Sequence, residues 1–176
     1  PHLSVTGACS AEWIPIKPKT DSAFLFAMIH VFLHERGRER LDIPFLKHRT
    51  SSPYLVGPNG LFMRDPDTRK PLMFDVRAGR PVPFDTPDVD PALEGSFIVD
   101  GIEVHADDTV ILHKKVTVTP AFVHLINHVR NYSPEWASTI CDVPAATIRR
   151  IANEFLEHAR VGETIDIEGM TLPLRP

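Results

Sequence analysis

The feature that most constrains the fold is a polar corner followed directly by an apolar run, "IPIKPKTDSAFLFAM" at residues 14–28. After this corner almost every residue is apolar, so a helix here would have almost no polar face to turn toward water. We therefore predict a helix over 21–35, buried on most sides, which ends near Gly37. Thr20 is the expected N-cap, and Asp21 places a negative charge in the first turn, where it meets the helix dipole favourably.

Composition narrows the classes of partner. The net charge of −4 gives no basic footprint, so we expect no nucleic-acid partner. The longest apolar run, 23–33, contains His30 and is too short to span a bilayer, so no membrane contact is expected of this segment. Cys9 and Cys141 lie in no metal-type spacing, and we interpret both as small hydrophobic residues.

The hydrophobic pattern is typical of a mixed α/β protein and divides the chain into three parts. The first part, residues 1–50, carries the long helix and a short strand predicted at 12–16. A second helix is predicted near 42–48, because Pro44 suits the first turn of a helix. This part therefore alternates α and β elements.

The second part, residues 51–118, is rich in Pro, Gly and Asp, and we interpret it as an irregular β-rich insert. The Asp100-Gly101 pair lies between two β-rich runs and predicts a hairpin turn. The acidic stretch 85–95 is interpreted as an exposed loop. The short strands are predicted at 54–57, 61–64, 71–75, 96–99 and 102–105.

The third part, residues 119–176, is predicted to be a helical segment that ends in a short hairpin. Ser133 is the expected N-cap of a helix that has Pro134 at its first position. Amphipathic helices are predicted within 119–132 and 142–162, the latter with one continuous apolar face. Beyond them, Glu168-Gly169 is the expected turn of the hairpin.

The corner itself is the first candidate binding site. A helix N-terminus exposes backbone N–H groups and a partial positive charge, and Lys17 and Lys19 would add to its attraction for anions. The Asp21 carboxylate can accept two parallel hydrogen bonds from a planar N–H/NH₂ edge such as that of guanine. The alternative is an ordinary capped helix with solvated lysines, and the motif alone leaves both interpretations open.

The histidines provide a second candidate. His30 and His34 are four residues apart in one predicted helix, as are His124 and His128 in another. Such pairs could share a metal ion, but spacing identifies no third ligand. The alternative interpretation is that these are partly buried helix histidines.

Further motifs follow one another in a definite order. The first are Pro1, Ser4 and Thr6, then Ile14-Pro15-Ile16, then Pro18-Lys19-Thr20-Asp21. Later come "LDIPFLKHRTSSPYLV" at 41–56, "KPLMFD" at 70–75, "NYSPEWASTICDVPAATIRRIANEFLEHA" at 131–159 and "LPLRP" at 172–176. In this order and spacing, the motifs resemble an internal segment of the catalytic subunit of molybdopterin-dependent oxidoreductases of the dimethyl sulfoxide reductase family.

The resemblance implies a fold as well as a family. It implies part of a Rossmann-like nucleotide-binding domain, with a Pro/Gly-rich β-hairpin insert and C-terminal helices. Residues 1–50 would then be a Rossmann-like half-unit that carries a cofactor-binding turn. The whole segment would be one fragment of a larger multidomain chain.

The resemblance also implies a cofactor, a molybdopterin guanine dinucleotide with Mo or W in the full-length parent. By the family's pattern Asp21 would hydrogen-bond the guanine edge, while Thr20 and Lys19 would line the nucleotide pocket. Ser4 and Thr6 would lie on the phosphate or ribose side of that pocket. One departure is notable, because Lys19 stands where the family often has Gly.

Other implied parts belong to the parent and not to this segment. The family's Cys motif for an iron–sulfur cluster is absent from these residues, and no catalytic residue or metal ligand is assigned here. We therefore expect no catalysis by the segment alone. The parent would be an oxidoreductase in the cytoplasm or periplasm of a prokaryote. The implied partners are an electron-transfer subunit and the remainder of the same catalytic polypeptide.

Two alternative functions fall outside the oxidoreductases. One is a stand-alone binding or assembly module without chemistry, and the other is a small metal-binding protein that uses the two HxxxH pairs. The apolar helix at 21–35 also bears on self-association, because uncovered apolar area promotes it. A homodimer of the isolated segment would then be unsurprising.

Overall fold

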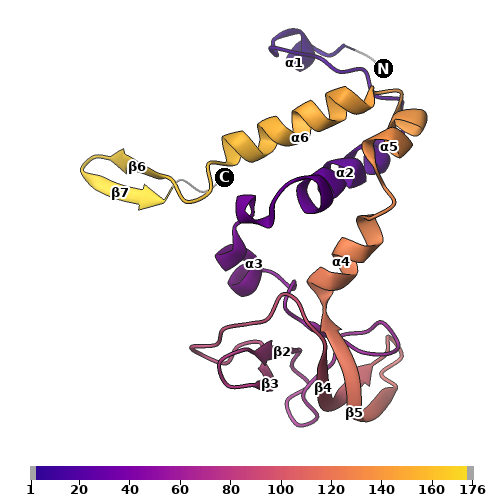
Figure 1. The fold of residues 1–176 in the computed structure, drawn as a ribbon, viewed down its shortest axis with the longest axis vertical. Helices are drawn as coiled ribbons and strands as arrows, with labels where there is room; N and C mark the ends of the chain where they lie inside the picture. Colours follow the sequence, from indigo (N-terminus) through magenta and orange to yellow (C-terminus); the bar gives the residue numbers. More distant parts are fainter. Residues whose placement is uncertain (1–2, 174–176) are drawn as a thin grey trace. The chain divides into compact units, whose positions relative to one another are not determined.

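The computed structural model describes residues 3–173 and divides into two compact units. Of the described residues, the helical unit comprises 3–42 and 128–173, and the β unit comprises 43–127. The described part is mixed α/β, which confirms the predicted fold class (Figure 1). Every strand pair that it contains is antiparallel, so the Rossmann-like half-unit is not confirmed.

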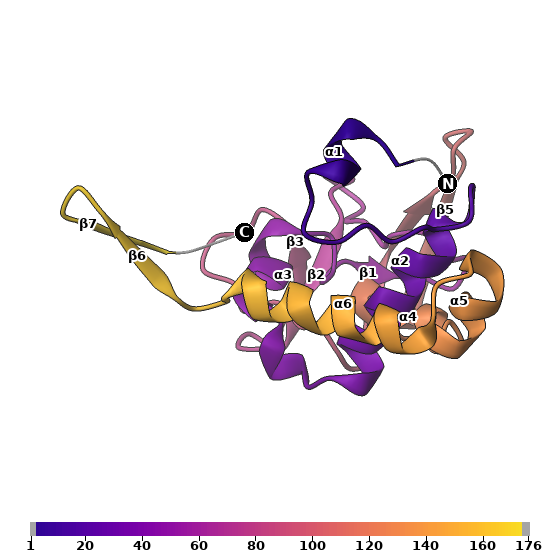
Figure 2. The same ribbon diagram turned by 90° about the horizontal axis from the view of Figure 1, so that it is seen from above.

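The helical unit is built around α2 (Asp21–His30), which packs on α5 (Pro134–Cys141) and α6 (Ala145–Ala159) (Figure 2). It also contains α1 (Val5–Ala8), a 3-10 turn (Arg38–Arg40) and the hairpin β6 (Thr164–Ile167) and β7 (Met170–Pro173). Its buried core consists of Ala23, Ala27, Met28, Val31, Ala137, Cys141, Val143, Ile148 and Ala152. Small residues dominate this list, which lets the three helices approach closely.

The predicted helix 21–35 is confirmed, with one local change. Its last turn, Val31–Glu35, is a π-helix, so the backbone there is wider than in α2. The prediction that this helix is buried on most sides holds for the face toward α5 and α6. On the other face, Leu25 is 55% exposed.

The β unit contains α3 (Ile43–Arg49), most of α4 (Ala121–Val129) and two small antiparallel sheets. One sheet has the order β1 (Leu55–Val56), β5 (Val110–Pro120) and β4 (Phe97–Val104). The other is the hairpin of β2 (Leu72–Asp75) and β3 (Arg80–Pro83). The core between them contains Leu55, Met63, Leu72, Val99 and Val118.

The hairpin predicted at Asp100-Gly101 is wrong. Residues 97–104 form one strand, with a bulge where Lys115 N–H donates to the Asp100 carboxylate at 2.6 Å. Gly101 has little room for a side chain, since a Cβ there would lie 2.9 Å from Met63 Cε and 3.0 Å from the backbone carbonyl oxygen of Arg64. The chain turns instead after His105, whose N–H donates to the Thr109 carbonyl at 2.9 Å.

Other predictions of strands and loops need correction. Residues 12–16 form no strand, because Pro15 has no N–H to donate to a ladder. The run 61–64 makes only isolated bridges, whereas β3 and β5 were not predicted. The stretch 85–95 is a loop, but it is not wholly exposed, because Val89, Pro91, Ala92 and Leu93 are buried.

Candidate functional site

The polar corner before α2 is shaped by an unusual backbone turn. Lys19 has φ 68°, in the left-handed region that favours glycine. Next to it, the Thr20 hydroxyl donates to the Lys17 carbonyl at 2.6 Å. Thr20 occupies the N-cap position as predicted, but its side chain makes no capping hydrogen bond to α2. The hydroxyl therefore closes the corner instead of capping the helix.

This turn leaves the start of α2 without a cap. Within residues 3–173, the amides of Asp21 and Ser22 have no hydrogen-bond acceptor, whereas Ala23 N–H donates to the Thr20 carbonyl at 3.0 Å. Uncapped amides at a helix N-terminus carry a partial positive charge and point outward along the helix axis. The side chains of Lys17, Lys19 and Asp21 are exposed beside them. The arrangement can accept an anion at the amides and offers a carboxylate to a donor.

One backbone hydrogen bond ties the corner to the core of the helical unit. Lys17 N–H donates to the carbonyl of Cys141 at 3.0 Å. Cys141 is fully buried at the end of α5, as expected of a small hydrophobic residue. The corner is therefore attached to a rigid element, although its polar side chains face outward.

The structure does not join Ser4 and Thr6 to this corner. Ser4 is the N-cap of α1, where its Oγ accepts from Gly7 N–H at 3.1 Å, and Thr6 lies exposed within α1. Among the described residues, no hydrogen bond or ion pair links α1 to residues 17–21. Pro1 and the end of the "LPLRP" motif lie outside the described residues.

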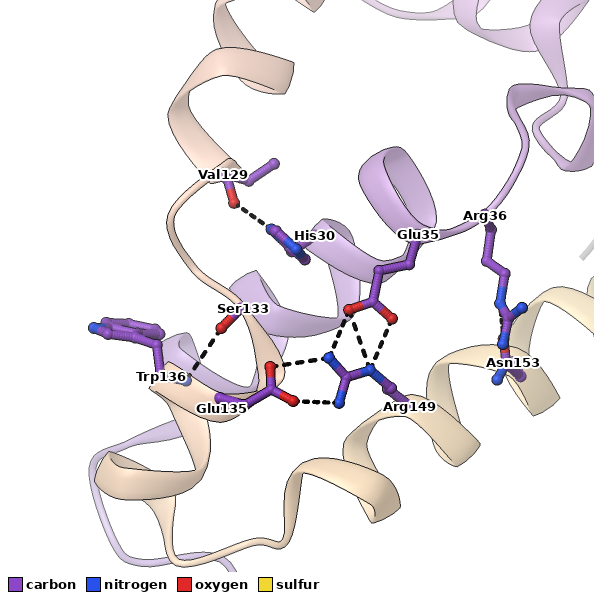
Figure 3. A network of polar contacts seen from close by, with 9 residues as sticks. All are labelled: His30, Glu35, Arg36, Val129, Ser133, Glu135, Trp136, Arg149 and Asn153. Carbon is purple, nitrogen blue, oxygen red and sulfur yellow. Dashed lines mark hydrogen bonds and ion pairs between the residues drawn. The ribbon is translucent and has the colours of Figure 1, made fainter.

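A polar network behind α2 was not predicted (Figure 3). Arg149 of α6 donates to Glu35, which ends the π-helical turn, and to Glu135 of α5. The hydrogen bond that Arg149 donates to Glu135 lowers the pKa of this carboxyl to about 2, and the hydrogen bonds that Arg149 donates to Glu35 and Glu135 raise the pKa of Arg149. Glu135 and Arg149 are therefore both charged at neutral pH. The network holds α2, α5 and α6 together and is structural.

The histidine pairs show no metal-binding arrangement. His30 donates from Nδ1 to the Val129 carbonyl at 2.9 Å (Figure 3). The centroids of the His30 and His34 rings are 4.9 Å apart. His124 Nε2 lies 2.9 Å from the Thr119 hydroxyl. In the part of the chain that the structure describes, no group of three or more His, Cys, Asp or Glu side chains could hold a metal ion.

The structure thus defines a mixed α/β segment whose clearest candidate site is an exposed, uncapped and lysine-flanked helix N-terminus. None of the helices in residues 3–173 has the length and apolar character to cross a bilayer. No protein-family model matches the chain.

Comparison with individual curated proteins, in contrast, identifies relatives of this chain. The chain is 35% identical over 167 residues to one subunit of the sulfite dehydrogenase of Allochromatium vinosum, covering 87% of this chain and 16% of the relative. It is 29% identical to the alpha subunit of the perchlorate reductase of Dechloromonas aromatica, and the match covers 82% of this chain and 18% of the relative. It is 27% identical to the alpha subunit of the dimethylsulfide dehydrogenase of Rhodovulum sulfidophilum, and the match covers 88% of this chain and 17% of the relative.

These relatives agree with the order of motifs in the sequence. The chain belongs to the dimethyl sulfoxide reductase family of molybdopterin-dependent oxidoreductases. It spans only 16–18% of the length of the three relatives named above. The family assignment therefore rests on a segment and not on a complete catalytic subunit.

Proposed function

We propose that this chain contributes the guanosine end of a molybdopterin guanine dinucleotide site in a catalytic subunit. The complete subunit would be an oxidoreductase that carries Mo or W and passes electrons to or from a partner subunit. The relatives named above are dehydrogenases and reductases, which supports a two-electron redox reaction. The present segment would bind and orient the cofactor and would catalyse nothing alone.

The uncapped start of α2 is the observation that carries this proposal. The amides of Asp21 and Ser22 have no acceptor among the described residues, and Lys17 and Lys19 lie exposed beside them. Free amides and lysines suit a phosphate, because both donate to its oxygens. The Asp21 carboxylate suits the N–H/NH₂ edge of guanine, since both of its oxygens can accept. The residues present therefore fit a guanine nucleotide.

Lys19 also fits this assignment through its backbone. The family pattern often has Gly at this position, and the observed φ of 68° is a conformation in which Gly is favoured. The same turn can therefore form with either residue. In this chain the lysine ammonium would add a charge that can pair with a phosphate. Thr20, whose hydroxyl is used by the Lys17 carbonyl, would line the pocket with its methyl group.

The cofactor, when bound, supplies the metal and the pterin electronics on which the redox reaction depends. The residues of this chain would supply only affinity and orientation. Asp21 would fix the guanine base, and the α2 amides and lysines would neutralise phosphate charge. Ser4 and Thr6 remain predicted contacts to phosphate or ribose.

The test uses the full-length polypeptide that contains this chain, produced in a host that makes the cofactor. Metal content is measured by mass spectrometry, and the guanine nucleotide released by acid is quantified by chromatography. We expect about one Mo or W atom per polypeptide, because one cofactor site would hold one metal atom. Asp21→Ala should reduce retained nucleotide about 10-fold, because hydrogen bonds to a charged group contribute ~1.5–3 kcal/mol.

Ser22→Ala is the matched control, since it changes an exposed side chain in the same helical turn and keeps the amides. It should retain the cofactor. Wild-type protein without Mo or W would contradict the proposed function itself. Full retention by the Asp21→Ala variant would contradict only the guanine contact.

A further inference from the structure

A cavity in the β unit, distinct from the corner before α2, has the chemistry of a second binding site. Its volume is about 650 Å³, and it is lined by α3 with the residues after it, by β2 with the turn after it, and by the loop after β3. This volume lies within the range of small-molecule sites, roughly 300–1,000 Å³. We call it the basic cavity.

The floor of the basic cavity is apolar and buried. Met73, Val89 and Pro91 line it, and all three side chains are buried in the protein. At its side, the rings of Tyr54 and Phe84 meet edge to face with centroids 5.8 Å apart. Phe84 is 43% exposed, so part of its ring is free to contact a ligand. A flat apolar group would find both a floor and an aromatic wall here.

The rim of the basic cavity is cationic. Lys47, Arg49 and Arg77 line it, together with His48. Arg77 is oriented by a hydrogen bond from Nη2 to the carbonyl of Asp88 at 2.5 Å, which leaves its other N–H groups free. Arg49 makes no hydrogen bond or ion pair with any residue in 3–173. Free guanidinium donors remain, therefore, at the mouth of the cavity.

Nearby carboxylates compensate part of this charge but leave the guanidinium donors unpaired. Lys47 Nζ pairs with the Asp90 carboxylate at 2.6 Å, and the Asp88 side chain also lines the cavity. The buried Asp75 carboxylate, which interacts electrostatically with Arg77, is a third negative charge close to the rim. The attraction for an anion therefore rests on the unpaired guanidinium donors of Arg49 and Arg77 and not on a surplus of positive charge. Asp88 could in turn accept a hydrogen bond from a ligand hydroxyl.

From these observations we propose that the basic cavity binds a small organic anion, one with a phosphate or carboxylate head on a flat apolar body. The head would contact Arg49 and Arg77, because guanidinium groups bind such oxyanions in a bidentate manner. The body would lie on Met73, Val89 and Pro91 and against Phe84. A bare inorganic oxyanion could use the rim but would leave the apolar floor uncovered.

The experiment measures binding by isothermal titration calorimetry on the full-length polypeptide that contains this chain. Adenosine 5′-monophosphate is the probe, inorganic phosphate represents the head alone, and adenosine represents the body alone. Benzoate distinguishes a carboxylate head from a phosphate head. We expect the nucleotide to bind at least about 10-fold more tightly than phosphate or adenosine, since only it uses both rim and floor.

Variants locate the site. Arg49→Ala and Arg77→Ala should each weaken nucleotide binding about 10-fold, and Arg49→Lys should restore part of it. Arg80→Ala is the matched control, because Arg80 is an exposed arginine of the same unit outside the cavity lining. Asp21→Ala should leave this binding unchanged, so a failure here is distinguishable from a failure of the proposed cofactor site.

Two results would overturn the inference. One is the absence of measurable binding by wild-type protein to all four probes, as expected if an acidic segment of the longer polypeptide covers the rim. The other is equal weakening by Arg49→Ala and Arg80→Ala, which would indicate non-specific attraction to positive charge. Thermal melting of each variant verifies that the fold is intact, since all three arginines are exposed.

Discussion

Glu35 and Arg149, which are 114 residues apart, are joined by a two-pronged ion pair in which Arg149 Nε and Nη2 each donate at 2.8 Å. Glu35 ends the π-helical turn that follows α2, and Arg149 lies on α6. The wider π-helical turn changes the direction in which the last side chain points. The same guanidinium reaches Glu135 on α5, so one side chain connects three helices.

Arg149→Ala should lower the free energy of unfolding by about 1 kcal/mol, because partly exposed ion pairs contribute roughly 0–1 kcal/mol each. The Arg149 side chain is 33% exposed, which weakens the interaction through solvent screening. Urea-induced unfolding measures the change. Arg160→Ala is the control, since its pair with Glu163 is more exposed. An equal effect of both substitutions would show that the connection of three helices adds nothing.

Glu135 should give the helical unit a pH-dependent stability at low pH. Its hydrogen bond from Arg149 lowers its pKa from 4.5 to about 2. A carboxyl with a lowered folded pKa stabilises the fold above its unfolded pKa, and this contribution is lost as the pH falls through the folded pKa. The melting temperature of wild type should therefore exceed that of Glu135→Gln at neutral pH. The difference should shrink between pH 4.5 and about 2. A constant difference would contradict this role.

Glu103 should be essential to the β unit, because its carboxylate is fully buried. It accepts from Asn59 N–H and Nδ2 at 3.2 and 2.7 Å, from Leu61 N–H at 3.2 Å and from His113 Nε2 at 2.8 Å. Glu103→Ala leaves these buried donors unpaired, which should cost ~3–5 kcal/mol in urea unfolding. Asp67→Ala, at an exposed position, should cost less than ~0.5 kcal/mol.

Gly57 and Gly60 offer a matched pair beside this carboxylate. A Cβ on Gly57 would lie 2.4 Å from Glu103 Oε1, which is held by hydrogen bonds and cannot move freely. A Cβ on Gly60 would meet nothing within 4 Å, although its φ is 78°. Gly57→Ala should therefore destabilise by several kcal/mol, on the order of an overpacked core. Gly60→Ala should cost only about 1 kcal/mol of left-handed strain. Similar losses on urea unfolding would contradict the packing argument.

Local chemistry explains which elements could be predicted from the sequence. The start of α5 follows from Ser133, whose Oγ accepts from Trp136 N–H at 3.3 Å. The hairpin of β6 and β7 follows from Glu168-Gly169, both of which have positive φ. In these cases the residues that determine the structure lie within a few positions of each other, so pattern and capping rules suffice.

The incorrect or missing predictions concern residues whose structure is determined by contacts with residues far away in the sequence. Gly101 was interpreted as a turn, but Met63 and the Arg64 carbonyl occupy the space that its Cβ would need. Arg149 gave no sequence signal, because its partner Glu35 is 114 residues away. Glu103 offered a weak signal, an acidic residue within an apolar strand, which could have suggested a buried carboxylate with its own donors.

The candidate site was predictable only in part. Chain order alone placed Lys19, Thr20 and Asp21 together at the start of a helix. The left-handed turn at Lys19 could not be read from the residue, because lysine rarely adopts it. Nor could the sequence show that the Thr20 hydroxyl would bond to Lys17 and leave the helix amides uncapped.

Substitutions of Lys19 separate its backbone role from its charge. Lys19→Gly relieves left-handed strain of about 1 kcal/mol but adds a similar entropy to the unfolded chain, so stability should change by less than ~0.5 kcal/mol. Lys19→Val should cost more than about 1 kcal/mol, because a β-branched residue fits poorly at φ 68°. Urea unfolding compares the two. In the full-length polypeptide, Lys19→Met keeps an unbranched side chain of similar length and removes the ammonium. Reduced nucleotide retention in that variant would assign the charge to phosphate binding, whereas full retention would assign Lys19 a backbone role alone.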